Sequence, residues 1–182
     1  MFEKYSIRTV FDAPCGDFNW MRQVVAENRI RYVGGDIVPA LVRINQSDHG
    51  DSQTNFINFN LTCDRFPEAD LWLCRDCLFH LCYREIHKAL GNFTQSGVRF
   101  VLLPNHRGSA AFENHDIRTG GFRKLNLQAP PFNFPHEIRQ RIQEGPAPDS
   151  DHEMCLWTRE QISSALPAME LALQAIEGAH AN

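Results

Sequence analysis

The stretch that decides the fold is residues 9–20, which read Thr-Val-Phe-Asp-Ala-Pro-Cys-Gly-Asp-Phe-Asn-Trp. The stretch begins with β-forming residues, which predict a strand, and Pro14 and Gly16 end that strand. Asp17 follows at a position suited to cap a helix, which we expect over residues 17–28. The apolar positions of that helix share one face: Phe18, Met21, Val24 and Val25. A buried strand, a tight turn and a helix in this order indicate a nucleotide-binding hinge.

The chemistry of the turn distinguishes between kinds of nucleotide. A pyrophosphate is bound by a Gly-x-Gly-x-x-Gly turn, whose backbone N–H groups close on it at the start of a helix. Here only Gly16 is present, Pro14 has no N–H to donate, and Asp17 adds negative charge. Asp12 at the strand end adds a second carboxylate. The turn therefore suits a ligand that carries an ammonium and a sulfonium group better than a pyrophosphate.

Residues 12–16, Asp-Ala-Pro-Cys-Gly, resemble motif I of the class I S-adenosylmethionine (SAM) dependent methyltransferases, usually a strand ending in Asp/Glu-x-Gly-x-Gly. Proline replaces the first glycine of that motif. The resemblance implies an α/β fold: a doubly wound, Rossmann-like, mostly parallel seven-stranded sheet in a single domain over residues 1–182. It also implies that SAM is the cofactor, held by residues of the motif: Asp12, Pro14, Cys15 and Gly16.

Proteins of this family generally carry an N-terminal helical segment that closes over the SAM pocket. Met1 to Ser6 is a short polar lead with no helix of its own, and the first strand is expected from about Ile7. We therefore expect a short version of the family without the lid helix. Either the domain is minimal, or a partner chain, a second copy in a homo-oligomer, a later loop or a missing segment supplies the lid.

The second predicted strand, Ile30–Ile37, ends in an acidic residue, Asp36. Its distance from Gly16 matches the roughly 20 residues of a βαβ unit in which such a carboxylate accepts hydrogen bonds from both ribose hydroxyls. The resemblance assigns Asp36 this role and places Ile37 beside the cofactor. The alternative is a strand-end residue that caps the next helix.

A helix is expected from Pro39 to Asn45, and a third strand after it. Residues 55–61 alternate between polar and apolar side chains, which is the pattern of a half-buried strand toward the edge of the sheet. In the family, the residues just past this strand flank adenine. Here those residues are Asn60 and Leu61.

Residues 70–81 are the second informative block. A buried strand over Leu71–Cys74 runs into polar Arg75 and Asp76 at its carboxyl end, where open α/β sheets bind ligands. The block resembles motif IV of the same family, and we expect Arg75 to contact the cofactor. The next helix has apolar residues three and four positions apart: Tyr83, Ile86, Leu90 and Phe93.

Cys74 and Cys77 have the Cys-x-x-Cys spacing of zinc and redox sites. A structural zinc site needs a second ligand pair, and only Cys82 offers an obvious third thiol. We therefore expect core packing and no metal. The six cysteines of the chain lie mostly in apolar runs, which favours reduced thiols.

Composition narrows the range of partners. A net charge of -4 and a pI near 6.0 argue against general affinity for nucleic acid or for an anionic membrane surface. No run approaches the roughly 20 apolar residues that span a bilayer. Met1 to Arg8 has no apolar signal-peptide core, so we expect a cytoplasmic protein without membrane association.

The chain changes character after the next predicted strand, Arg99–His106. Glycines, prolines, charges and phenylalanines follow, with a short strand expected over residues 122–128. We interpret residues 107–151 as an insertion that forms the acceptor pocket; the alternative is a surface loop held by its aromatic residues. Residues 114–135 resemble a little-characterised bacterial methyltransferase subgroup, often associated with glycan and surface-polymer pathways. The resemblance implies a small-molecule or glycan acceptor.

The C-terminal part reads as a short helix over residues 138–145, a last strand over 152–157 and a long final helix. Thr158 and Gln161 have the spacing of a capping box at the start of that helix. We expect Pro167 to kink or divide it.

Methyl transfer from SAM is an in-line displacement, and a hydroxyl acceptor must also lose a proton. The candidate bases are Asp76, His106 and Asp116, with His80 and His115 as further possibilities. Two other functions stay open. One is a binding module that keeps the fold without turnover. The other is a nicotinamide-dependent oxidoreductase, against which the chemistry of the turn argues.

Overall fold

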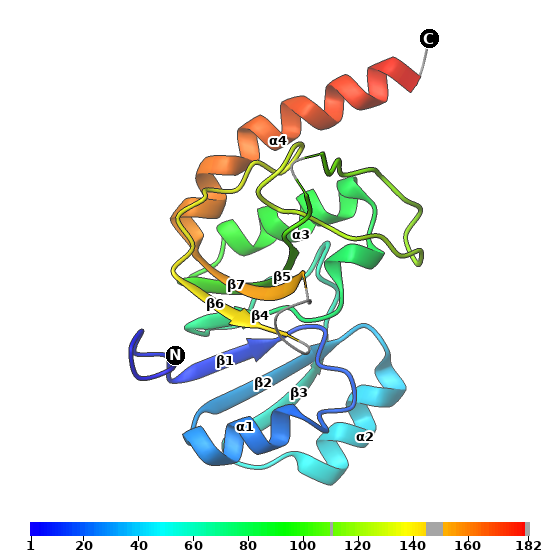
Figure 1. Cartoon of the computed structure of the whole chain (residues 1–182). Coiled ribbons are helices and arrows are strands. Elements are labelled where there is room, and N and C mark those ends of the chain that lie inside the picture. Colours follow the sequence, from blue (N-terminus) through cyan, green and yellow to red (C-terminus); the bar gives the residue numbers. More distant parts are fainter. Residues whose placement is uncertain (110, 145–150, 181–182) are drawn as a thin grey trace.

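The computed structural model describes residues 1–109, 111–144 and 151–180. A seven-stranded sheet in the order β3-β2-β1-β4-β5-β7-β6 forms its centre (Figure 1). β1 to β5 pair in parallel, and β7 is antiparallel to both of its neighbours. The expected mostly parallel seven-stranded sheet is confirmed. The strands are β1 Thr9–Asp12, β2 Arg31–Asp36, β3 Thr54–Asn58, β4 Leu71–Leu73, β5 Phe100–His106, β6 Gln140–Gln143 and β7 His152–Thr158.

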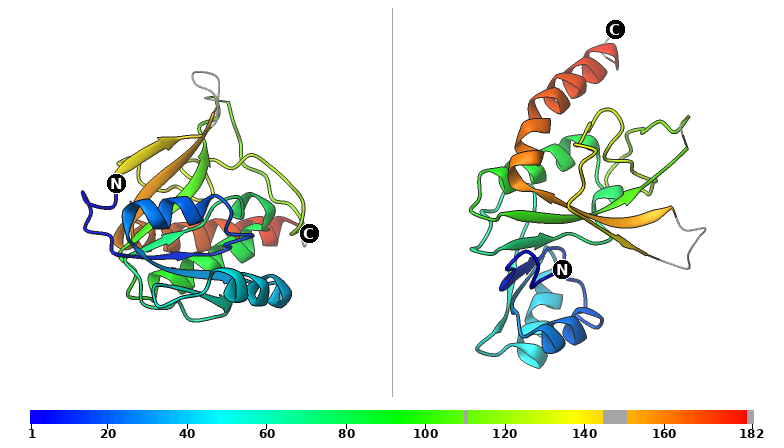
Figure 2. Two further views of the ribbon diagram at one scale, coloured as in Figure 1. Left: turned by 90° about the horizontal axis from the view of Figure 1, so that it is seen from below. Right: turned by 60° about the vertical axis from the view of Figure 1, so that its left-hand side comes forward.

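Helices cover both faces of this sheet, as the doubly wound prediction requires (Figures 1 and 2). α1 (Met21–Asn28) and α2 (Pro39–His49) lie on one face, with Met21 and Val42 in the core beneath them. α3 (Tyr83–Thr94) and α4 (Arg159–His180) lie on the other. A short 3₁₀ turn, η1, spans Leu78–His80. None of the helices in the described residues is long and apolar enough to cross a membrane.

The larger core lies between the sheet and the pair α3 and α4. Trp72 of β4 and Phe93 of α3 are fully buried there, with their ring centroids 5.4 Å apart. Phe66 contacts both rings and also packs edge-on against Phe11 of β1. The predicted apolar face of α3 is therefore confirmed: Tyr83, Ile86, Leu90 and Phe93 are all buried.

The hinge is longer than its sequence predicts. α1 begins at Met21 and not at residue 17, so the expected cap at Asp17 is wrong. The Asp17 side chain instead accepts hydrogen bonds from the backbone and the side-chain amide of Asn19, at 3.1 and 2.7 Å. Gly16 and Phe18 both have left-handed backbone angles, with φ of 56° and 60°. This local turn competes with the helix and delays its start by four residues.

The segment after β5 contains no strand over residues 122–128, so that prediction is wrong. Side chains of β5 accept the hydrogen bonds from this segment's backbone that a neighbouring strand would otherwise accept. The N–H of Leu125 donates to Nδ1 of His106 at 3.1 Å, and the N–H of Leu127 donates to Oδ1 of Asn105 at 2.8 Å. Phe132, farther along, is fully buried in the core against α3 and α4. The segment is thus a structural layer of the core.

The region from 138 onward pairs with the sheet. β6 lies where a short helix over residues 138–145 was predicted, and Gly145 lies outside the described residues. The last strand is confirmed, as is the capping box. The Gln161 N–H donates to Thr158 Oγ1 at 3.2 Å, and the Thr158 N–H donates to Gln161 Oε1 at 2.9 Å. α4 includes Pro167 and is not divided by it.

Candidate active site

The carboxyl ends of β1, β2, β4 and β5 lie at one edge of the sheet, and the predicted site residues follow them (Figure 1). Asp12 ends β1 and Asp36 ends β2. The two carboxylates are close enough that the charge of Asp36 helps to raise the pKa of Asp12. Both acidic strand ends therefore belong to one edge, as the sequence predicts.

The Asp36 carboxylate joins the hinge to the start of α2. Its Oδ2 accepts a hydrogen bond from the N–H of Gly16 at 3.2 Å, and its Oδ1 accepts one from the N–H of Val38 at 3.0 Å. Val38 is the N-cap of α2, and no side chain caps this helix among the described residues, so the helix-capping interpretation is wrong: Asp36 fixes the turn that precedes the helix. An ionised carboxylate accepts about four hydrogen bonds, and these two leave capacity for a diol. The same side chain can therefore also accept hydrogen bonds from a ribose.

Asp12 is buried, with only 1% of its surface exposed. Its Oδ2 accepts a hydrogen bond from the hydroxyl of Tyr32 at 2.8 Å, while its Oδ1 has no partner among the described residues. Burial raises the pKa of Asp12 to about 7, although the Tyr32 hydrogen bond and the charge of Arg75 oppose the rise. A buried acceptor without a donor is costly, so this oxygen is a position that a ligand cation would stabilise.

A small cavity opens beside the hinge, between the ends of β1 and β2 and the loop after β3. Its volume is about 190 Å³, below the roughly 300 Å³ at which ligand pockets begin, so it would hold only part of a nucleoside ligand. Four predicted cofactor residues line it: Pro14, Ile37, Asn60 and Leu61. Leu81, Glu85 and Thr119 close its far side.

Cys15 fixes the hinge through its backbone and does not line the cavity. Its N–H donates to the carbonyl of Gly35 at 2.9 Å, and burial raises the pKa of its thiol to about 12. Asn45 on α2 also supports the hinge, because its side-chain amide donates to the carbonyl of Gly16 at 2.7 Å. Asn45 was not predicted from the sequence. The signal for it is a polar residue on the buried face of a helix.

Arg75 lies at the end of β4 within a network of charges. Its Nε donates to Oε1 of Glu144 at 2.8 Å, and its guanidinium stacks 4.9 Å from the ring centroid of Trp20. Asp76 lies beside it, 3.8 Å away from the guanidinium, with a left-handed φ of 51° and about half of its side chain exposed. Glu144 and Trp20 were not predicted, since only the folded chain brings them to Arg75.

Two of the candidate bases, His106 and Asp116, make structural contacts. Nδ1 of His106 accepts the Leu125 N–H, which places the ring proton on Nε2, and burial lowers the pKa of this imidazole. The ring stacks on His152 with centroids 4.7 Å apart. Asp116 is exposed at the start of α3, where its Oδ1 accepts the N–H of Tyr83 at 2.7 Å. Asp76 and His106 thus both neighbour His152, whereas Asp116 contacts α3.

The cysteines pack only in part as expected from the sequence. All six are free; Cys15, Cys74 and Cys155 are buried, whereas Cys77 and Cys82 are half-buried and Cys63 is exposed. Burial and the neighbouring Cys77 raise the pKa of the Cys74 thiol well above its ordinary value. Cys74 therefore provides neither a thiolate nucleophile nor a ready thiolate ligand.

The fold is that of the class I SAM-dependent methyltransferases. Human N-acetylserotonin methyltransferase, solved in complex with SAM, matches 85% of this chain with a TM-score of 0.64 and 14% identity. An O-methyltransferase family 2 protein from Planctomyces limnophilus, solved with apigenin, matches 82% with a TM-score of 0.60 and 14% identity. The chain spans 48% and 50% of these two proteins.

A TehB-like SAM-dependent methyltransferase from Corynebacterium glutamicum is similar over 83% of this chain and 79% of its own length, with a TM-score of 0.53 and 15% identity. At such identities the likeness establishes the fold alone. No protein-family model matches the sequence, and no curated protein is significantly similar to it.

Proposed function

We propose that this chain binds SAM at the carboxyl edge of β1, β2 and β4 and transfers the methyl group to a small-molecule or glycan acceptor. The observation that carries the proposal is the Asp36 carboxylate, which anchors the Gly16 amide and keeps acceptor capacity, while its chain neighbours Gly35 and Ile37 line the cavity. The fold supports it, because the solved proteins named above are SAM-dependent methyltransferases or carry SAM.

The residues present fit the nucleoside half of SAM. Asp36 has lone pairs left for both ribose hydroxyls after its two backbone contacts. The cavity next to it is mostly apolar, and Ile37 and Leu61 on its wall suit the faces of an adenine ring. We therefore assign ribose binding to Asp36, and adenine binding to Pro14, Ile37, Asn60 and Leu61.

The residues also fit the amino acid half, which carries an ammonium and a sulfonium group. Asp12 presents a buried carboxyl oxygen without a donor at this edge, and a nearby cation would stabilise its ionised form. Cys15 and Gly16 contribute the backbone that such a ligand would lie against, and Arg75 borders the same edge. A pyrophosphate would instead face Asp12 and Asp36 with no glycine-rich turn to hold it. This contrast favours SAM over a nicotinamide dinucleotide.

SAM, when bound, supplies a methyl carbon that the acceptor's lone pair attacks while the electron pair of the carbon–sulfur bond moves to sulfur, leaving S-adenosylhomocysteine. A hydroxyl acceptor also releases its proton to a base or to water. We assign Asp76 and His152 to the acceptor side of the site. His106 is a positioning residue, because it stacks on His152. Exposed Phe122, which packs on Phe79, offers an aromatic surface from the 107–151 segment.

Calorimetric titration with SAM, S-adenosylhomocysteine and NAD tests the cofactor. We expect the first two to bind and NAD not to bind. Asp36→Asn weakens SAM binding about tenfold or more, since hydrogen bonds to a charged group contribute about 1.5–3 kcal/mol. Asp48→Asn, at an exposed position on α2, leaves the affinity unchanged. Equal affinity for SAM and NAD, or an unchanged affinity in Asp36→Asn, contradicts the assignment.

Methyl transfer from labelled SAM to a cell extract tests turnover. Labelled product that disappears when Asp36 is replaced supports an enzyme. SAM binding without any labelled product supports the alternative of a binding module that has the fold but no activity.

A further inference from the structure

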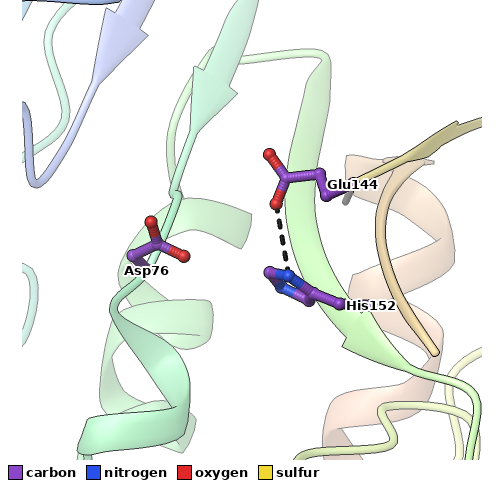
Figure 3. Close-up of side chains that lie close together, drawn as sticks. All are labelled: Asp76, Glu144 and His152. Carbon is purple, nitrogen blue, oxygen red and sulfur yellow. Dashed lines mark ion pairs between the residues drawn. The ribbon is translucent and has the colours of Figure 1, made fainter. Parts of the chain in front are cut away.

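Three side chains able to bind a metal ion converge next to Arg75 (Figure 3). Asp76 follows β4, Glu144 follows β6, and His152 opens β7. One ligand atom from each lies within 4.8 Å of the other two, and Figure 3 shows all three side chains pointing into one space. Among the side chains that the structure describes, no other group of three potential ligands has this spacing.

The spacing is close to that of a coordination shell. Ligands about 2.1 Å from a metal ion lie about 3 Å apart when adjacent and about 4.2 Å apart when opposite. Nδ1 of His152 lies 3.4 Å from Oε2 of Glu144, near the distance for adjacent ligands. One carboxylate oxygen of Asp76 lies within 4.8 Å of a ligand atom of each of the other two residues, and about half of this side chain is exposed.

An independent observation concerns the two oxygens of Glu144. Oε1 accepts the hydrogen bond from Arg75, whereas Oε2 is buried and accepts no hydrogen bond from the described residues; its one described polar contact is the ion pair with Nδ1 of His152. Leaving a buried acceptor without a donor costs about 1–3 kcal/mol, and a cation at Oε2 removes that cost. Arg75 meanwhile fixes the orientation of the carboxylate, as partners of metal ligands commonly do.

Charge and ring orientation favour the same interpretation. Asp76 and Glu144 supply two carboxylates, and both pair with the same guanidinium, that of Arg75, so the cluster has more acidic side chains than Arg75 can match. Stacking on His106, with an angle of 17° between the rings, holds the His152 imidazole in place. Both a fixed ligand and a negative field suit a divalent cation.

We propose that Asp76, Glu144 and His152 bind a divalent first-row transition metal ion. Two carboxylates with one imidazole favour Mn²⁺, Fe²⁺, Co²⁺ or Zn²⁺ over Mg²⁺ and Ca²⁺, which prefer oxygen ligands alone. The inference departs from the sequence, which predicts no metal, because no local spacing links the three residues. Three protein ligands leave positions for water or for an acceptor oxygen, and only this last consequence rests on the proposed function.

The test uses the full chain, freed of metal with a chelator and then dialysed. Titration with MnCl₂, followed by the electron paramagnetic resonance signal of free Mn²⁺, is expected to show one bound ion with a Kd below about 1 mM. Titration with CoCl₂ is expected to produce visible absorption bands of a protein-bound ion. Asp76→Asn, Glu144→Gln and His152→Gln each weaken Mn²⁺ binding at least about tenfold.

Two exposed residues outside the cluster supply matched controls. Asp48→Asn removes a carboxylate and His115→Asn removes an imidazole, and both variants are expected to bind Mn²⁺ as the wild type does. Far-ultraviolet circular dichroism checks that each variant is folded. Asp76→Asn is decisive if the others unfold, because its side chain is half-exposed.

Failure of the wild type to bind Mn²⁺ and Co²⁺ overturns the proposal, as does wild-type affinity in the folded ligand variants. The cluster is then an ion-pair network alone. SAM titrated in the presence of chelator tests the proposed function separately, so the two can fail independently.

Discussion

Replacing Asp12 with Asn removes a buried carboxyl group whose pKa the fold raises from 3.8 to about 7. Because the folded state holds this proton more tightly than the unfolded chain does, the proton stabilises the fold. That stabilisation is complete below about pH 4 and is lost as the pH rises through about 7. The Asn side chain has a similar shape and does not ionise, so the variant lacks this pH dependence.

The size of the effect follows from the shift. One unit of pKa corresponds to about 1.36 kcal/mol, so a rise from 3.8 to about 7 corresponds to roughly 4 kcal/mol of unfolding free energy. Relative to Asp12→Asn, the wild type should therefore lose roughly 4 kcal/mol between about pH 4 and pH 7 and then level off. Contributions from titrating groups that do not neighbour Asp12 cancel in this comparison.

Urea unfolding followed by tryptophan fluorescence measures the free energy at each pH, since buried Trp72 and Trp157 report on the core. Asp48→Asn is the control and should parallel the wild type. A wild-type free energy that does not fall relative to Asp12→Asn as the pH rises refutes the reasoning. Asp12 would then remain ionised in the fold, and its unpartnered oxygen would have a donor that the geometry does not show.

Further predictions concern the ligand, the hinge and the core. SAM affinity rises with pH up to about 7 and then levels off in calorimetry, because the ligand's positive charge favours ionised Asp12, and the rise is absent in Asp12→Asn. Gly16→Ala lowers the unfolding free energy by about 1–2 kcal/mol in urea titrations, since φ is 56° although the added methyl meets no atom within 4 Å. Phe132→Ala lowers the unfolding free energy by about 3–5 kcal/mol, whereas Phe122→Ala, at an exposed position, changes it by no more than about 0.5 kcal/mol. Equal losses in the two variants would contradict a core role for the segment after β5.

The parts of the fold that local patterns determine could be predicted from the sequence. Asp36 is an example, because a strand, a turn and an acidic strand end follow each other within one βαβ unit. α3 is another, because its apolar spacing is set within the helix itself. The capping box needs only Thr158 and Gln161, three residues apart.

The failures occur where distant segments decide the outcome. β6 has only four residues and is held by its pairing with β7, so its own sequence carries little signal. Asp12 was expected to offer a charge, but Tyr32 and the surrounding core bury its carboxyl group and raise its pKa. Glu144 reaches Arg75 across 69 positions of sequence, a separation that no local pattern reveals.

A crystal structure with S-adenosylhomocysteine bound tests the cofactor assignment most directly. We expect both ribose hydroxyls within hydrogen-bonding distance of the Asp36 carboxylate and the adenine ring in the cavity beside Ile37 and Leu61. A ligand bound elsewhere, or a ribose turned away from Asp36, would contradict it.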